Sequence, residues 1–162
     1  MSEIVVMGID PGLANTGLGI IEFNESEGIV SITSDVINTR TIDLEYKRLY
    51  KIYSKMIDII DHTKPHIASM ENVFVDRSTM SSGIGVAYAK SAIAVALAQR
   101  DIALFEYEPS TIKMAITGNG RASKEQVRRM VKQRLGISER VTQHVCDALA
   151  SALCHIQREG LL

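Results

Sequence analysis

VVMGIDPGLANTG, residues 5–17, is the stretch around which the rest of this chain is organised. Its first residues form a continuous apolar run, typical of a strand covered on both faces, and Pro11-Gly12 ends that run with turn chemistry. Asp10 is the last residue before the turn. Because a carboxylate at the rim of an apolar strand needs a cation or several donors, two interpretations stay open. Asp10 binds a metal ion, or it caps its own turn through a side-chain hydrogen bond.

A second carboxylate occupies the same kind of position further along the chain. Residues 67–70 have the pattern of a short strand, and Glu71 stands at its end. If this strand and the first are parallel neighbours, Asp10 and Glu71 face each other at one edge of the sheet, where α/β folds bind their ligands. The alternative is a surface glutamate at the end of a strand.

The remaining pattern of apolar residues predicts an α/β architecture. Strands are expected over residues 5–10, 16–23 and 29–37 as an antiparallel meander, and over 67–70 and 102–107. Helices are expected from Asp43 to Lys64-Pro65, from Ser78 or Ser81 to Gln99, over 110–116, from a capping box at Ser123 to Leu135, and over about 142–158. The chain shows no internal repeat or linker, so residues 1–162 are expected to form one domain.

Composition excludes several classes of protein. The chain of 162 residues is 46% hydrophobic, but it has no apolar run of about 18–20 residues that could span a membrane. The N-terminus carries an acid where a signal peptide has basic residues, which predicts a cytoplasmic protein. Cys146 and Cys154 lie eight residues apart on an expected helix, so they cannot bridge each other and are interpreted as buried thiols.

Positive charge is concentrated in one segment. Residues Glu108 to Arg140 contain eight basic and three acidic residues, a net charge of +5, whereas the whole chain has a net charge of −1. A basic segment on an acidic body is expected of a protein that contacts nucleic-acid phosphates along one face. The alternative is a solvated basic helix, with Arg128, Arg129 and Lys132 on its exposed face.

Two other features have more than one interpretation. His144 and Asp147 are three residues apart, so they lie on one face of the last helix, either as a metal-binding pair or as a simple polar pair. Phe74 lies in an expected loop and either stacks on an unpaired base or packs in the core. The small residues of the helix up to Gln99 favour close packing on the sheet, on another helix, or on the same helix of a second subunit.

Three motifs in order, GIDPG with Asp10, MENVF with Glu71 and HVCDALA with Asp147, resemble the RuvC family of Holliday-junction resolvases. The stretches FEYEPSTIK and DALASAL extend the resemblance over almost the whole chain. It implies an RNase H-like fold with a five-stranded mixed sheet, three antiparallel strands then two parallel ones, flanked by α-helices. It also implies a crossover junction endodeoxyribonuclease, a hydrolase that resolves Holliday junctions by paired symmetric nicks during recombination and DNA repair.

The resemblance further implies that Asp10, Glu71 and Asp147 hold two Mg²⁺ ions per subunit. At the fourth position many relatives have aspartate, and this chain has His144. Neutral imidazole is a competent ligand, and the site carries one negative charge less, so Mn²⁺ is expected to substitute for Mg²⁺. In a two-metal mechanism the ions clamp the scissile phosphate. Whether His144 is a metal ligand or a general base stays open.

The DNA contacts and partners also follow from the resemblance. Lys113 and Lys124 match positions that hold DNA phosphates, Phe74 matches an aromatic that enters the opened junction, and Arg121 ends the basic loop between them. Four-way junction DNA has two-fold symmetry, which agrees with a homodimer. The RuvA and RuvB branch-migration proteins are implied as partners by the resemblance alone.

Three other functions compete with this interpretation. An actin-like sugar kinase or chaperone ATPase has a similar strand-end aspartate, but needs two such domains to enclose a nucleotide, and 162 residues supply one. A non-catalytic junction-binding module would have lost its metal ligands, whereas every expected position here carries a residue that can bind metal. An RNA-processing nuclease of the same fold differs from a resolvase only in its substrate.

Overall fold

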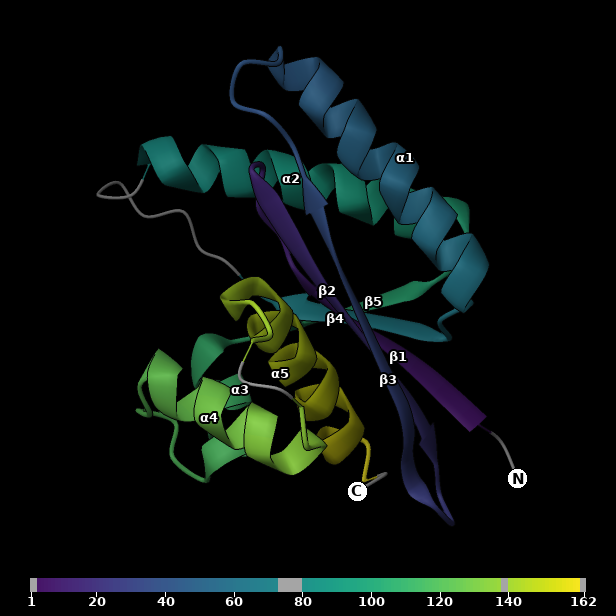
Figure 1. Cartoon of the computed structure of the whole chain (residues 1–162), viewed down its shortest axis with the longest axis vertical. Helices are drawn as coiled ribbons and strands as arrows, with labels where there is room; N and C mark the ends of the chain where they lie inside the picture. The colour runs from purple at the N-terminus through teal and green to yellow at the C-terminus, as the bar shows by residue number, and fades with distance from the viewer. Residues whose placement is uncertain (1–2, 73–79, 138–139, 161–162) are drawn as a thin grey trace.

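The computed structural model describes residues 3–72, 80–137 and 140–160, and these form a five-stranded sheet in the order β3-β2-β1-β4-β5 (Figure 1). Its strands are β1 (Glu3–Asp10), β2 (Asn15–Asn24), β3 (Gly28–Asn38), β4 (Ile67–Glu71) and β5 (Ala103–Tyr107). The helices are α1 (Glu45–Thr63), α2 (Met80–Gln99), α3 (Pro109–Thr117), α4 (Lys124–Leu135) and α5 (Gln143–Arg158).

The sheet has the predicted mixed topology. β1 pairs antiparallel with β2, and β2 pairs antiparallel with β3, which confirms the meander. β4 runs parallel to β1 and to β5, as the connections through α1 and α2 require. The RNase H-like arrangement of three antiparallel strands followed by two parallel ones is therefore confirmed.

Helices cover both faces of the sheet. α1 and α2 lie on one face, and α3, α4 and α5 lie on the other (Figure 1). Successive side chains of β1 point to opposite faces of the sheet, so they contribute to two separate hydrophobic cores. Val5, Met7 and Ile9 pack towards α1 and α2, whereas Val6 packs towards α5. Asp10 has the same parity as Val6 and so belongs to the face that α5 covers.

Glycines allow α5 to lie close to this face. Gly8 and Gly19 are direct cross-strand partners, and Gly17 is the partner of Asp10. A Cβ on Gly8 would be 1.9 Å from the Ala148 carbonyl oxygen, and one on Gly17 would be 2.3 Å from the His144 carbonyl oxygen. Real Cβ atoms do not approach other atoms this closely. The three glycines therefore allow the short packing distance between α5 and the sheet.

The ends of α4 match the sequence signals, whereas the start of α1 does not. The capping box at Ser123 and Gln126 is present, and Gly136 ends α4 in the left-handed conformation. The expected start of α1 at Asp43 is wrong: Leu44 has the extended backbone of an N-cap residue (φ −60°, ψ 140°), so the helix begins at Glu45.

The cysteines and the hydropathy of the helices agree with the composition. Cys146 and Cys154 are buried free thiols, as predicted. In the described parts of the chain no helix is both long enough and apolar enough to cross a bilayer.

Candidate active site

Asp10 and Glu71 end two adjacent parallel strands. The register between β1 and β4 pairs Ile9 with Met70, and each carboxylate residue is the next residue along its strand. The parallel arrangement on which the sequence argument depended is therefore present. Both acids lie at the same edge of the sheet, and both are only partly exposed.

α5 brings His144 onto Asp10. The helix begins after Thr142, whose hydroxyl accepts a hydrogen bond from the Val145 amide, and His144 lies in its first turn. Nδ1 of His144 is 2.7 Å from Oδ2 of Asp10. The turn after β1 is instead held by Thr16, whose hydroxyl donates to the Gly12 carbonyl. In the described part of the chain, the Asp10 carboxylate therefore contacts α5 and not its own turn. This contact does not support the alternative in which Asp10 caps the turn.

Asp147 has a different partner. The Arg128 guanidinium on α4 binds its carboxylate in a bidentate arrangement, with Nε 3.0 Å from Oδ1 and Nη2 2.8 Å from Oδ2. The two side chains are only 21% and 23% exposed. The prediction that Arg128 lies on the exposed face of α4 is therefore wrong, because the helix turns this residue towards α5.

The electrostatics connect these acids to one another. Burial raises the pKa of Asp10 above its ordinary value; the His144 hydrogen bond opposes this, and the charge of Asp147 adds to it. Burial likewise raises the pKa of Glu71, where Lys124 opposes the shift and the charges of Asp147 and Asp10 add to it. The negative charges of β1, β4 and α5 therefore act on one another across a small region that is partly shielded from water.

A small cavity joins the acids to the basic residues. Its volume is about 90 Å³, and its lining includes Glu71, Asp147, Lys113 and Lys124. The structure thus brings two of the predicted DNA contacts, one from α3 and one from α4, to the acidic residues. Arg121 lies exposed in the loop between these helices and does not line this cavity. Phe74 lies outside the described residues.

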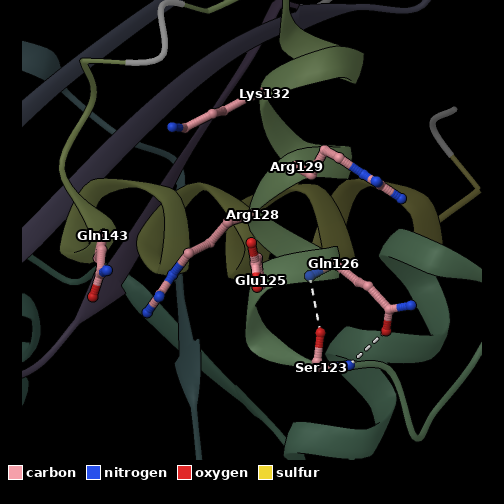
Figure 2. A pocket seen from close by; sticks show the side chains of 7 residues that line it. All are labelled: Ser123, Glu125, Gln126, Arg128, Arg129, Lys132 and Gln143. Atoms are coloured by element: carbon pink, nitrogen blue, oxygen red, sulfur yellow. Dashed lines mark hydrogen bonds between the residues drawn. The ribbon is translucent and has the colours of Figure 1, made fainter.

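A larger groove borders the site. It has a volume of about 760 Å³ and runs along α4 to the start of α5, lined by Ser123, Glu125, Gln126, Arg128, Arg129, Lys132 and Gln143 (Figure 2). Figure 2 shows the Arg128 and Arg129 side chains leaving α4 in opposite directions, with Arg128 on the side of Gln143. Three basic residues and one acid line the groove, so it is suited to an anionic ligand.

Comparisons with known proteins identify the family of this chain. Residues 6–155 match the family model described as "Crossover junction endodeoxyribonuclease RuvC". The chain belongs to the RuvC family. The RuvC protein of Anaplasma marginale (strain St. Maries) is 40% identical over 94% of this chain and 93% of its own length. That of Mycobacterium sp. (strain KMS) is 36% identical over 97% of this chain and 85% of its own.

Solved structures give the same result. Thermus thermophilus RuvC in complex with a Holliday junction substrate superposes with a TM-score of 0.86 at 30% identity, covering 98% of this chain and 97% of that one. The yeast mitochondrial Holliday junction resolvase has a TM-score of 0.70 at 16% identity, covering 96% and 79% of the two chains, and supports the fold alone.

The donor set of this RuvC family member fits a divalent cation. Carboxylate oxygens are the ligands of hard cations, and imidazole suits transition metals. Burial is the main cause of the raised pKa values of Asp10 and Glu71, and a bound cation would stabilise the ionised form that burial disfavours. Within the described residues, however, no three His, Cys, Asp or Glu side chains form a group that could hold a metal ion.

Sequence reasoning missed two contributors to this site. Arg128 was assigned to the exposed face of α4, yet it lies four residues after Lys124, a spacing that places both on one face of the helix and could have located it. Gly17 was included in the opening stretch without a role, although a glycine inside an expected strand indicates a close approach of another backbone.

Proposed function

We propose that this chain is a metal-dependent endodeoxyribonuclease that resolves Holliday junctions by paired symmetric nicks, with residues 1–162 acting as one nuclease domain. The observation that carries the proposal is that the charges of Asp10, Glu71 and Asp147, from three separate elements, act on one another in a member of the RuvC family, while Lys113 and Lys124 line one cavity with Glu71 and Asp147. Recombination and DNA repair are the processes in which this activity is used.

The metal ligands in this proposal are Asp10, Glu71, His144 and Asp147. Two bound Mg²⁺ ions, for which Mn²⁺ can substitute, would supply an activated water and stabilisation of the leaving 3′-oxygen. The side chains prepare the site by placing negative charge where it is only partly hydrated, so that binding a divalent cation relieves their mutual repulsion. A protein nucleophile is not required.

His144 is oriented by its contact with Asp10. With Nδ1 bonded to that carboxylate, Nε2 is the ring nitrogen that can serve as a ligand or accept a proton. The same contact holds the first turn of α5 against β1. The rank order of metals in a His144→Asp variant distinguishes the two roles, because a ligand role predicts a shift of preference from Mn²⁺ towards Mg²⁺.

The basic residues bind the substrate in this proposal. Lys113 and Lys124 reach the phosphate next to the acids, because both line the cavity that contains Glu71 and Asp147. Arg121 contacts the DNA backbone further out, from the loop between α3 and α4. Phe74 enters the opened junction and stacks on a base.

A homodimer is the assembly that suits a two-fold symmetric junction. The outward face of α2 supports it, because Ile84, Tyr88 and Val95 lie on one side of the helix and are 43%, 43% and 60% exposed. We propose that the two copies associate through α2, so that each active site meets one of the two strands of like polarity. RuvA and RuvB are the proposed partners of this dimer.

The experiment that tests the function is a gel assay with a synthetic mobile four-way DNA junction. The purified protein is incubated with Mg²⁺, Mn²⁺ or EDTA, beside linear duplex DNA and structured RNA of matched length. Paired symmetric nicks confined to the junction and dependent on metal are expected. Binding without nicking in either metal would indicate a non-catalytic junction-binding module, and cleavage of the RNA alone would indicate an RNA-processing nuclease.

A further inference from the structure

The ion pair between Arg128 and Asp147 places a resident cation on a proposed metal ligand. Arg128 donates to both carboxylate oxygens at 3.0 and 2.8 Å, the fork geometry in which arginine binds a carboxylate most strongly. Both side chains are about four-fifths buried, so water screens the attraction only in part. This arrangement neutralises one of the three acids whose charges act on one another, by means of the chain's own residue.

The other two acids are not neutralised in this way. Asp10 is bonded to the imidazole of His144, and Glu71 has the charges of Lys124 and Lys113 near it but forms no ion pair with a described residue. Asp147 is therefore the acid that a positively charged side chain holds. A divalent cation bound to Asp147 would lie within a few ångströms of the guanidinium, and two positive charges at that separation repel each other strongly in a partly buried site. One of them must move away.

We propose that Arg128 is a counter-ion that Asp147 exchanges for the active-site metal, and that the released guanidinium binds a phosphate of the DNA substrate. This inference rests on the proposed function. Its consequence is that metal and junction bind cooperatively. Metal alone must break the Arg128–Asp147 pair without providing the arginine with another anion, whereas metal and DNA together give both charges a partner.

The groove beside α4 supports phosphate as the new partner. Arg128 lines this groove together with Arg129, Lys132 and Gln143 (Figure 2), and the groove adjoins Asp147 because the same guanidinium reaches both. A guanidinium binds phosphate with the same bidentate geometry that it uses for a carboxylate. Moving from Asp147 to a phosphate in the groove therefore requires a change of side-chain rotamer and no rearrangement of α4.

The first experiment measures Mn²⁺ binding to the DNA-free protein by the loss of the free-ion signal in electron paramagnetic resonance. Arg128→Gln is expected to bind Mn²⁺ roughly tenfold more tightly than wild type, a factor typical of coupling between sites. Arg128→Lys keeps the charge but loses the fork, so it should fall between the two. Arg129→Gln is the matched control, because it removes the same charge from the neighbouring position of α4, and it should stay within about twofold of wild type.

The second experiment measures junction affinity with Ca²⁺ and with EDTA. Because coupling between two ligands is reciprocal, the ratio of these affinities should fall in Arg128→Gln by about the same factor by which its Mn²⁺ affinity rises. A purely structural role for Arg128 would lower the melting temperature and leave both measurements unchanged.

The outcomes separate this inference from the proposed function. If Mn²⁺ does not bind the wild-type protein, or binds Asp10→Asn equally well, the proposed metal site is wrong. The proposed exchange of Arg128 for the metal is then wrong as well. If Asp10→Asn loses Mn²⁺ binding while Arg128→Gln binds Mn²⁺ no more tightly than wild type, the metal site stands and the counter-ion exchange is overturned.

Discussion

Gly17→Ala tests whether the close approach of α5 positions the active site. Gly17 pairs with Asp10 across β1 and β2, and a Cβ there would be 2.3 Å from the His144 carbonyl oxygen and 2.8 Å from its Cβ. An ordinary contact begins at 3.4 Å, so the first turn of α5 must retreat by about 1.1 Å. The obstacle is backbone and cannot be relieved by changing a rotamer.

The expected effect is much larger on the rate than on substrate binding. A retreat of about 1 Å separates His144 from Asp10, which are 2.7 Å apart in the native site. A misplacement of this size costs about 100-fold in rate. The free energy of unfolding should fall by about 1–3 kcal/mol, as for other overpacked positions. Junction affinity in EDTA should change little, because the basic residues of α3 and α4 remain in place.

The assay is single-turnover cleavage of a four-way junction, with circular dichroism to confirm that the variant is folded. Gly85→Ala is the matched control, since its new Cβ would be 3.5 Å from Leu13, an ordinary contact. Gly19→Ala should be intermediate, because its nearest neighbours are the side-chain carbons of Leu149. A folded Gly17→Ala protein that cleaves at the wild-type rate would refute the reasoning.

Three further results are expected. Asp10→Asn and Asp147→Asn should each abolish cleavage yet keep junction binding in a gel-shift assay, because a metal ligand is lost and the basic face is kept; retained cleavage with lost binding would contradict this. Glu71→Gln should raise the free energy of unfolding of the metal-free protein at pH 7, measured in urea titrations. The raised pKa of Glu71 means that the folded state holds the Glu71 proton more tightly than the unfolded chain does. The free energy of unfolding of the wild type therefore falls as the pH rises above about 4.5, and the variant should lack this decrease. Equal pH profiles of the two proteins would count against this prediction. Lys113→Ala and Lys124→Ala should each reduce the slope of log affinity against log salt concentration by about one, and unchanged slopes would remove these lysines from the DNA contacts.

Local sequence patterns were sufficient to predict the elements and the two strand-end acids. An apolar run followed by Pro11-Gly12 ends a strand whatever surrounds it, because the turn residues impose their own backbone angles. The capping box at Ser123 is likewise a local signal. The placement of Asp10 beside Glu71 needed one further assumption, that the two strands are parallel neighbours, which the connection through α1 made the natural expectation.

The partners of the functional side chains could not be obtained in this way. The spacing of His144 and Asp147 placed both on one face of α5, but it did not show that one binds Asp10, 134 residues away, and the other binds Arg128. Those contacts depend on how deeply α5 packs on the sheet and on the rotation of α4 against it. A helical pattern shows that a face is apolar or charged, and it does not show which element will lie opposite that face.

The sequence by itself therefore determined the order of strands and helices, the two acids at the strand ends and the sign of the charge near them, because each of these depends on residues close together in the chain. Only the tertiary structure decided that Gly8, Gly17 and Gly19 allow α5 to pack closely on β1 and β2, and that Arg128 forms an ion pair with Asp147. These contacts join segments that are distant in sequence, and close packing of the core sets their distances.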